Sequence, residues 1–421
     1  MNSVLIITYY WPPGAGAGVQ RWLKFCKYLP DFGWEPLILT VDPQYAQYPA
    51  TDESLLKDVS ENLKIFKTPA VNYFRLASNK KAGIPSAGFA NQGRKGPAQW
   101  LMRFIRGNFF IPDPRKGWNR FAFKKACEII NNENVERIIT SGPPHSTHLV
   151  GLKLKKKFPN ILWIADFRDP WTDIYYYREF CHTLPARLLD RHYEKTVLIN
   201  ADKIITVGET LKKILSSKAS GISDKTFVVT NGYDEEDFKG IQPVEPDIFT
   251  ITYTGTLSQA YPLAGFAEAV RKLADSGMAL RLRFVGAVSM EQKKLLLSYV
   301  PENMVEFIPY ASHPEAIKYM VSSSALLLII PDHESNKSIV TGKLFEYLAS
   351  GRPVILIGPK DGDAAEIVEK CKAGKSFGYD EASEIGLFIL NLAAKKIKNN
   401  ISAINTFSRK NLAYLISALL R

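Results

Sequence analysis

Short apolar runs alternate along most of the chain with segments whose apolar residues recur every three or four positions. Runs rich in Val, Ile and Leu are typical of buried strands, and the segments between them are typical of amphipathic helices. We expect strands in the first half at Val4–Thr8, Pro36–Val41, Arg137–Thr140, Ile161–Ala165, Ala201–Val207 and Phe227–Thr230. The second half repeats them at Phe249–Thr254, Leu280–Val285, Val305–Ile308, Ala325–Ile330 and Val354–Ile357. This alternation predicts an α/β protein with parallel sheets covered by helices.

Chain length and one polar stretch divide this pattern into two domains. A chain of 421 residues is long enough for about two domains, each with its own core. The stretch Lys239–Pro246 is polar and contains two prolines, so we interpret it as a linker. We therefore expect an N-terminal domain over residues 1–238 and a C-terminal domain over residues 247–400. Residues 401–421 are predicted to form a helix that packs across the domains.

The segment from Ser338 to Gly358 has the pattern of a loop, a helix, a turn and a strand. Thr341 suits the N-cap, where its hydroxyl can accept a hydrogen bond from a free N–H, and Gly351 suits the C-terminal stop. Lys343 and Glu346 are three residues apart and share one helix face. A helix start with a cation suits a diphosphate, and a carboxylate one turn later suits a ribose diol. An ordinary surface helix with a solvated Lys–Glu pair explains the same pattern.

A glycine-rich turn follows the first predicted strand. Gly14, Gly16 and Gly18 precede a predicted helix, and glycines allow backbone N–H groups to approach a phosphate or a sugar closely. Asp42, after the second predicted strand, is placed to bind a ribose as in dinucleotide-binding proteins. A nicotinamide-dependent enzyme is therefore one alternative. A tight strand-to-helix turn with no ligand is another.

Polar residues also follow two later strands. His145 and His148 come just after Arg137–Thr140. This His-x-x-His pair lacks a third metal ligand nearby, so it indicates polar contacts in a cleft or local hydrogen bonds at a helix start.

The second group, Asp166, Arg168 and Asp169, lies in the stretch DFRDPW after the next strand. Three charged residues beside two aromatics suit a polar substrate. An internal Asp–Arg pair that fixes the loop is the alternative.

The positive charge of the chain is concentrated in one insertion, residues 72–118, and its flank. The formal net charge is +12. Between Arg75 and Lys125 there are twelve Lys or Arg residues and a single acid, Asp113. An anionic surface is the expected partner of such a segment.

Aromatic and basic residues are mixed within this insertion. Trp100 and Phe104 can share one face of a helix, with Arg103 and Arg106 beside them. This composition favours a membrane interface with anionic lipid. Packing of the aromatics on the domain is the alternative, and nucleic acid is not expected as a partner.

Cysteine usage and hydropathy limit the class of protein. The four cysteines are widely spaced and form no CxxC pair, so neither a zinc site nor a disulfide framework is indicated. The start of the chain lacks the features of a signal peptide, and no run approaches the ~20 apolar residues of a membrane span. We expect a cytoplasmic protein that is soluble or peripheral to the inner face of the membrane.

Seven stretches together resemble glycosyltransferases of the two-Rossmann-domain (GT-B) type, close to family four. They are PPGAGAG, SGPPHSTHLVG, DFRDPW, ADKIITVGET, VVTNGYDEEDF, YTGTLS and TGKLFEYLASGRPV. The last is the most specific, because it matches the family pattern K-x-x-E-x-x-A-x-G-x-P-V. The resemblance implies two Rossmann-like doubly wound domains that face across a cleft. It also implies retaining transfer of a hexose-type sugar from a nucleoside-diphosphate sugar, with no cofactor and no metal.

The resemblance assigns roles to particular residues. Glu346 would bind the ribose hydroxyls, and Lys343 with the amides before its helix would neutralise the diphosphate. The implied catalytic residues are His145, Asp166, Arg168 and Lys343. The implied donor-binding residues are Gly16, Gly18, Gly255, Thr256, Ser338, Val340, Thr341, Gly342, Lys343 and Glu346. Trp100, Arg103, Phe104 and Arg106 are expected to contact the acceptor or a membrane.

Two departures from the family pattern affect this expectation. Many family members have a glutamate eight residues before the one that matches Glu346, and here that position is Ser338, with Glu334 nearby. Many also have an Arg and a Lys after the first strand of the second domain, and the corresponding stretch TGTLSQAYPLAG here includes neither. Either Lys343 neutralises more of the donor charge, or a cation such as Arg168 or Arg178 reaches it.

The resulting hypothesis is a hexosyltransferase of bacterial surface polysaccharide synthesis, such as that of lipopolysaccharide or capsule. Its acceptor would be a lipid-linked compound or an oligosaccharide, and it would be peripheral to the anionic inner leaflet. A non-catalytic nucleotide-sugar-binding protein is the alternative from another class. A nucleotide-sugar epimerase is also compatible, with Asp166 or Asp169 as acid/base groups.

Overall fold

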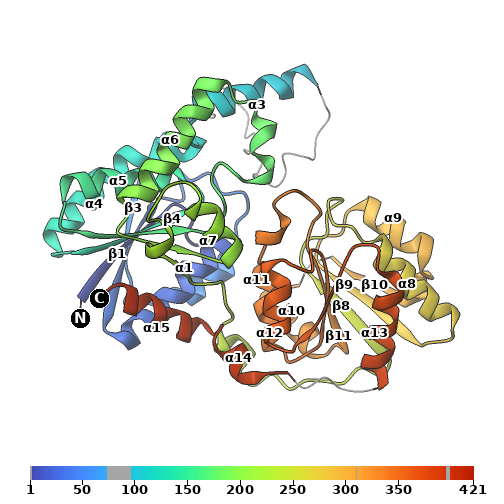
Figure 1. Ribbon diagram of the computed structural model, residues 1–421. Coiled ribbons are helices and arrows are strands. Elements are labelled where there is room, and N and C mark those ends of the chain that lie inside the picture. Colours follow the sequence, from blue (N-terminus) through green and yellow to red (C-terminus); the bar gives the residue numbers. More distant parts are fainter. Residues whose placement is uncertain (1, 74–95, 310, 395–398) are drawn as a thin grey trace. The chain divides into compact units, whose positions relative to one another are not determined.

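The computed structural model describes residues 2–73, 96–309, 311–394 and 399–421. The chain forms two compact units, which are unit 1 (Met1–Thr230 with Leu412–Arg421) and unit 2 (Asn231–Asn411) (Figure 1). Part of the basic insertion lies outside the described residues, namely Arg75, Lys80, Lys81, Arg94 and Lys95.

Unit 1 is built on a seven-stranded sheet with the order β3-β2-β1-β4-β5-β6-β7, in which all neighbouring strands are parallel. Its strands are β1 (Asn2–Thr8), β2 (Trp34–Val41), β3 (Lys64–Thr68), β4 (Arg137–Gly142), β5 (Leu162–Phe167), β6 (Lys203–Thr206) and β7 (Thr226–Val228). Its helices are α1 (Ala17–Tyr28), α3 (Pro97–Phe109), α4 (Asn119–Asn132), α5 (Ser146–Lys157), α6 (Leu184–Asn200), α7 (Glu209–Ser216) and most of α15 (Arg409–Leu419). Because β1 is central, its residues are buried on both faces, which explains its uninterrupted apolar run.

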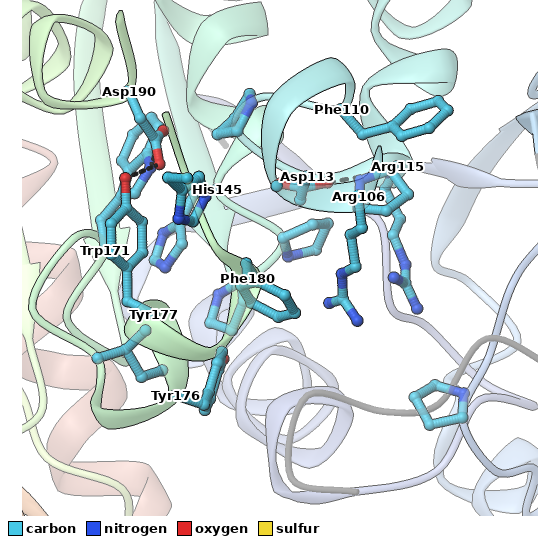
Figure 2. Close-up of a pocket in the computed structure, with 18 of the residues that line it drawn as sticks. Arg106, Phe110, Asp113, Arg115, His145, Trp171, Tyr176, Tyr177, Phe180 and Asp190 are labelled. Atoms are coloured by element: carbon cyan, nitrogen blue, oxygen red, sulfur yellow. Dashed lines mark hydrogen bonds between the residues drawn. The ribbon is translucent and has the colours of Figure 1, made fainter. Parts of the chain in front are cut away.

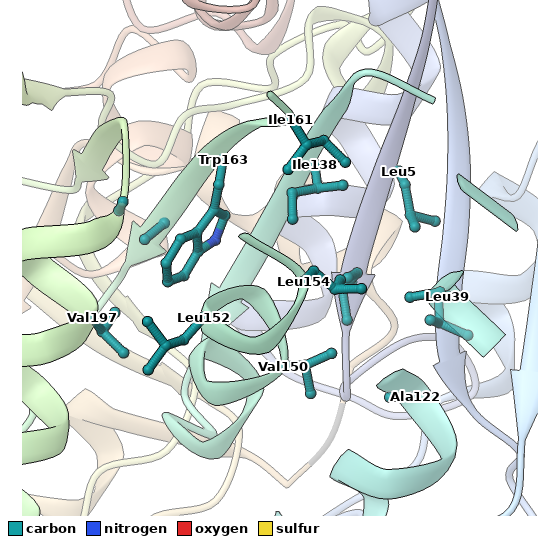
Figure 3. Packing of buried hydrophobic residues seen from close by; sticks show 14 of the residues in the cluster. Leu5, Leu39, Ala122, Ile138, Val150, Leu152, Leu154, Ile161, Trp163 and Val197 are labelled. Carbon is teal, nitrogen blue, oxygen red and sulfur yellow. The ribbon is translucent and has the colours of Figure 1, made fainter. Parts of the chain in front are cut away.

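The two faces of this sheet pack into separate cores. Leu5 and Leu39 on one face join Ala122 of α4 and Val150 of α5 in the cluster that Figure 3 shows. Val4 and its neighbours on the other face contact α1 and α15. Alternate strand residues therefore serve opposite layers, as the two-residue period of a strand requires.

The stretch after residue 400 forms two helices, α14 (Ile401–Asn405) and α15, and the residues from Leu412 onward belong to unit 1. Leu412, Ile416 and Leu420 are buried in the same cluster as Val4. The guanidinium of Arg137 donates to the carbonyl of Leu420 at 2.9 Å, which satisfies part of the helix end. The helix thereby belongs to the core of unit 1.

Unit 2 has a six-stranded parallel sheet with the order β10-β9-β8-β11-β12-β13. Its strands are β8 (Phe249–Thr254), β9 (Leu280–Val285), β10 (Val305–Ile308), β11 (Ala325–Ile329), β12 (Val354–Ile357) and β13 (Gly374–Phe377). Its helices are α8 (Ala264–Asp275), α9 (Met290–Tyr299), α10 (His313–Val321), α11 (Gly342–Ala349), α12 (Asp363–Lys370), α13 (Ala382–Ala394) and α14 (Ile401–Asn405). Two doubly wound parallel sheets confirm the predicted fold class.

The two units divide between residues 230 and 231, ahead of the predicted linker. Residues of the linker stretch contact unit 2, because Glu245 forms an ion pair with Arg352 at 3.1 Å and the Val244 amide donates to Ser322 at 3.4 Å. No helix in the described ranges is long and apolar enough to span a bilayer.

Candidate functional site

In unit 2, two glycines bring the ends of neighbouring strands into close contact. Gly255 follows β8 with a φ of 96°, and Gly286 follows β9 with a φ of 124°. A Cβ atom on Gly286 would lie only 2.5 Å from the Gly255 carbonyl oxygen. Both positions therefore require glycine, for backbone conformation and for space. Such an edge, at the carboxyl ends of parallel strands, is where open α/β sheets bind ligands.

Lys343, in the first turn of α11, lies against this edge. Its amine donates a hydrogen bond to the Tyr253 hydroxyl at 2.8 Å and lies 4.3 Å from the centre of that ring. A Cβ atom on Gly255 would be 2.9 Å from the Lys343 side chain, so the glycine leaves room for the amine. Burial of the amine lowers the pKa of Lys343 to about 8. No carboxylate in the described part of the chain forms an ion pair with it.

Glu346 lies one turn further along α11 and is held by a histidine. The Nε2 atom of His313, at the start of α10, is 3.0 Å from a carboxylate oxygen of Glu346. About one fifth of the Glu346 side chain remains exposed. The carboxylate is therefore oriented but still accessible to a ligand.

The start of α11 differs from the prediction at Thr341. This residue is the N-cap, but its hydroxyl makes no capping hydrogen bond. Its oxygen is buried without a partner among the described residues. The predicted side-chain cap is thus wrong, and a polar group is left at the helix start. Val340 is buried in the core, and the amide of Gly342 lies in the first turn of the helix.

Two other donor-binding candidates of unit 2, Ser338 and Thr256, differ in exposure. Ser338 is buried, and its hydroxyl donates to the Ser335 carbonyl at 3.0 Å. Glu334, in the same loop, is exposed, and so is Thr256 after β8. Ser338 therefore stabilises the loop, and its hydroxyl is already used.

In unit 1, the structure brings together Gly18 and Arg168. The Arg168 guanidinium donates to the carbonyls of Gly142 at 3.0 Å and Pro143 at 2.6 Å. A Cβ atom on Gly18 would overlap this guanidinium. Gly16 has a φ of 111°, which favours glycine. Gly18 and Arg168 form one packed junction between the first turn and the loop after β4.

Asp166 is fully buried and cannot contact a substrate. Its carboxylate accepts hydrogen bonds from Arg21 at 3.0 and 3.3 Å, from Trp22 at 2.7 Å and from Ser141 at 2.9 Å. Arg21 is also fully buried and donates to backbone carbonyls. The prediction of a catalytic role for Asp166 is therefore corrected to a structural one. The ion-pair alternative is right in kind, but its partner is Arg21 and not Arg168.

His145 and His148 have different surroundings. His148 is buried, stacks on Phe167 at 4.4 Å and has its Nδ1 atom 2.9 Å from the Thr140 hydroxyl. Burial lowers the pKa of His148 to about 3, so its ring is neutral. His145 stacks on Trp171 at 5.0 Å and its pKa is lowered by burial, then by His148. Of the two, His145 lines a cavity.

This cavity, of about 110 Å³, lies in unit 1 and is shown in Figure 2. It is surrounded by the loop after β4, helix α3, and the 3₁₀ helices η4 (Pro114–Trp118) and η5 (Tyr175–Phe180). The charged groups in its wall are Arg106, Asp113, Arg115 and Asp190. The aromatic residues in its wall are Tyr10, Phe110, Trp171, Tyr176, Tyr177 and Phe180. Polar and aromatic walls of this kind suit a polar ligand.

The four residues of α3 that were expected to contact the acceptor or a membrane differ in their surroundings. Trp100 is 55% exposed and stacks on Phe104 at 5.4 Å. Arg103 is half-buried. Arg106 instead points into the cavity, where its guanidinium lies 4.3 Å from the centre of the Phe180 ring (Figure 2). Arg106 thus contributes to a site within unit 1.

Sequence reasoning missed several residues of both sites. Tyr253 and His313 orient Lys343 and Glu346, but each comes from a distant part of the chain. Asp190 accepts hydrogen bonds from Trp171 at 2.8 Å and Tyr177 at 2.9 Å beside the unit 1 cavity. An isolated acid in a helical pattern gives no signal of such a role.

Neither the family models nor the curated proteins include a match to this chain. Solved structures do match over nearly the full length. A sucrose-phosphate synthase from Thermosynechococcus elongatus has a TM-score of 0.65 at 15% identity, covering 100% of this chain and 98% of that one. The lipopolysaccharide outer core galactosyltransferase WaaB has a TM-score of 0.60 at 12% identity, covering 99% of each chain.

A third solved structure has a different activity in its name. A putative UDP-N-acetylglucosamine 2-epimerase from Listeria monocytogenes has a TM-score of 0.56 at 12% identity, covering 99% of this chain and 95% of that one. At these identities the similarity shows the fold alone. The chain has the GT-B fold, with a seven-stranded and a six-stranded parallel sheet.

Proposed function

We propose that this protein is a hexosyltransferase that uses a nucleoside-diphosphate sugar as donor. The proposed acceptor is a lipid-linked compound or an oligosaccharide in bacterial surface polysaccharide synthesis. The similarity in fold to a lipopolysaccharide galactosyltransferase supports this class of reaction. The name of the epimerase neighbour supports a UDP-sugar as the kind of ligand that this fold accepts.

The observation that most supports the donor site is the position of Lys343. A desolvated amine at a helix start, beside two glycine turns, has the chemistry of a diphosphate site. Glu346, held by His313, is placed one turn later, where a carboxylate can accept hydrogen bonds from a ribose diol. The unpaired Thr341 hydroxyl adds a polar group at the same helix start.

The proposed chemistry depends on stabilising the leaving group. As the sugar–phosphate bond breaks, the nucleoside diphosphate gains negative charge, which Lys343 and the N–H groups of the helix start would stabilise. Protonated Lys343 would supply this charge without a metal ion. We propose that the acceptor attacks on the face from which the diphosphate leaves, so that the anomeric configuration is retained. His145 would contact the transferred sugar through a neutral ring.

The proposed membrane contact involves the exposed apolar surface of α3 and α6, which lie side by side in unit 1 (Figure 1). The exposed apolar residues of this surface are Trp100, Leu101, Met102, Ile105 and Phe109 on α3 and Leu184, Leu188 and Leu189 on α6. An exposed apolar patch flanked by arginines is typical of an interfacial contact with anionic lipid. This supports a location on the inner face of the membrane.

The test of the proposed function is donor turnover by the purified full chain. Thermal shift with UDP-, GDP-, ADP- and CMP-sugars would first identify the donor. Release of the nucleoside diphosphate from that donor, with and without EDTA, would then be measured. We expect slow release into water that EDTA leaves unchanged. Binding without release would instead support the non-catalytic alternative, which Ser338 and the missing Arg/Lys pair also favour.

An epimerase on the same fold requires accessible carboxylates as acid/base groups. The buried Asp166, fully paired by Arg21, Trp22 and Ser141, does not meet this requirement. Asp169 is the remaining candidate, and burial raises its pKa. Conversion of the donor sugar to its epimer without release of the nucleoside diphosphate would favour this function over transfer.

A further inference from the structure

Two arginines, the half-buried Arg106 and the buried Arg115, line the unit 1 cavity without an acidic partner. Arg106 from α3 and Arg115 from η4 point into the same space (Figure 2). In the ranges that the structure describes, neither guanidinium forms an ion pair. Arg115 is only 7% exposed, its Nε atom is buried without an acceptor, and a terminal nitrogen makes one long hydrogen bond of 3.4 Å to the Gln47 carbonyl.

The two carboxylates in the cavity wall are already engaged. Asp113 accepts hydrogen bonds from the Arg115 amide at 2.9 Å and from the amide and hydroxyl of Ser146 at 2.8 and 2.9 Å. Asp190 accepts from Trp171 and Tyr177, and burial raises the pKa of Asp190 to about 7. Asp190 is therefore partly protonated near neutral pH. The cavity keeps a positive charge that its own side chains do not neutralise.

This arrangement is unfavourable unless an anion is bound. Burial and then the charge of Arg115 lower the pKa of Arg106. A buried charge without a partner destabilises the fold. An anion with several oxygens would offset the repulsion between the two guanidinium groups and accept hydrogen bonds from their N–H groups. The planar guanidinium binds phosphate through two parallel hydrogen bonds, so phosphate matches this pair best.

Helix α3 connects this charged site to the apolar surface. Its inward side supplies Arg106, and its exposed side supplies Leu101 and Phe109. The helix is fixed against η5, because a Cβ atom on Gly107 would lie 2.3 Å from the Phe180 carbonyl oxygen. Asn108 also donates to the Cys181 carbonyl at 3.1 Å. The position of the Arg106 guanidinium is therefore fixed relative to the apolar surface.

We infer that Arg106 and Arg115 bind the phosphate group of an amphiphilic acceptor whose apolar chain lies along α3 and α6. This inference rests on the proposed transferase function and specifies its acceptor as a phosphate-bearing lipid. Charge complementarity places the phosphate in the cavity, and the adjacent exposed apolar residues accommodate the chain. A neutral saccharide would leave both arginines unpaired.

The test is calorimetric titration of the full chain, without nucleotide sugar, with three probes. These are octyl phosphate, octanol and inorganic phosphate. Octyl phosphate is expected to bind at one saturable site, and the other two at least about tenfold more weakly, since each lacks one half of the interaction. Arg106→Gln and Arg115→Gln should each weaken octyl phosphate binding about tenfold or more. Arg187→Gln, which removes an exposed charge on α6, is the matched control and should change affinity less than about twofold.

Each other outcome overturns the inference. Unchanged affinity in Arg106→Gln excludes the guanidinium site, and equal binding of octanol excludes the phosphate. Equal binding of inorganic phosphate excludes the lipid and indicates a soluble anion. Circular dichroism would check folding, and Arg106→Lys, which keeps the charge, should recover part of the affinity if folding is not the cause. Because no donor is present, failed donor turnover with intact octyl phosphate binding would overturn the transferase function alone.

Discussion

The amine of Lys343 donates a hydrogen bond to the Tyr253 hydroxyl at 2.8 Å and lies 4.3 Å from the centre of the same ring. Tyr253 is neutral, so this contact orients the amine without cancelling its charge. A Lys–carboxylate pair would orient it equally well but would compete with an incoming anion. The electrostatic field at the start of α11 is thereby kept available for the donor diphosphate.

Replacement of Lys343 should therefore impair turnover more than folding. We expect Lys343→Met to slow donor turnover on the order of 10²-fold, because the leaving diphosphate loses its cation. The melting temperature should stay equal or rise, since a desolvated charge is removed. Lys294→Met, on the exposed side of α9, is the control. Equal turnover in the two variants would show that Lys343 does not contact the donor.

Donor binding should depend on pH through the same amine. The pKa of Lys343 is lowered to about 8 by burial, so the free protein loses this cation as pH rises past that value. Above it, donor affinity should fall by up to tenfold per pH unit. Calorimetry with a UDP-sugar is suitable, because its diphosphate diester keeps a constant charge over this range. In Lys343→Met the pH dependence of donor affinity should disappear. If it persists in this variant, another group is the cause.

Asp166 should prove important for stability rather than for chemistry. Asp166→Asn removes the carboxylate that pairs with the buried Arg21 and is expected to cost roughly 3–5 kcal/mol in the free energy of unfolding. Glu128→Gln breaks the exposed pair with Lys125 and should cost less than about 1 kcal/mol. Urea denaturation would compare the two. If Asp166→Asn were as stable as the wild type but inactive, the corrected structural role would be wrong.

Asp190 should make the protein less stable as pH rises toward neutrality. Its folded-state pKa, raised to about 7 by burial, is above that of the unfolded chain, so the folded state binds more protons between the two values. Stability is then highest below pH ~4 with respect to this group and is lost between about pH 4 and pH 7. Asp190→Asn should flatten this part of the profile. Denaturation midpoints of the wild type and of Asp190→Asn would be measured across that pH range. An equal slope of midpoint against pH in both proteins would show that Asp190 is not the cause.

Membrane binding should depend on the exposed residues of α3. The double replacement Leu101→Glu with Phe109→Glu is expected to weaken binding to anionic vesicles by roughly tenfold or more, because burial of each apolar side chain contributes about 1.5–3 kcal/mol. Leu297→Glu, at an exposed position of α9, is the control. Co-sedimentation of the wild type with vesicles is the measurement. Absence of wild-type binding would contradict the proposed membrane contact.

The fold could be predicted from the sequence because central parallel strands are buried on both faces. β1 and β11 are almost continuously apolar, and such runs predict buried strands. The edge strands β3 and β13 were missed, since one side of an edge strand meets solvent and its sequence mixes Lys with apolar residues. Local patterns therefore identified every central strand and the edge strands β7 and β10, but not the edge strands whose apolar pattern is interrupted by Lys.

The candidate site was predictable only where its chemistry lies within one local motif. Lys343 and Glu346 share a helix turn, and their spacing alone placed them together. Asp166 followed a strand and looked equally accessible, but its partner Arg21 lies 145 residues earlier. Arg106 lay within an amphipathic helix and was assigned to the membrane side. Its inward direction depends on Phe180, which a periodic pattern does not reveal.

The return of α15 to unit 1 has a consequence for how the protein is made. Unit 2 is one continuous segment, whereas the core of unit 1 is complete only when Leu412, Ile416 and Leu420 are present. During synthesis the residues before 231 emerge from the ribosome ahead of α15, so one apolar face of unit 1 stays uncovered until α15 follows. Unit 2 can finish folding earlier, although it is translated later. A truncation that removes α15 would leave the core of unit 1 incomplete.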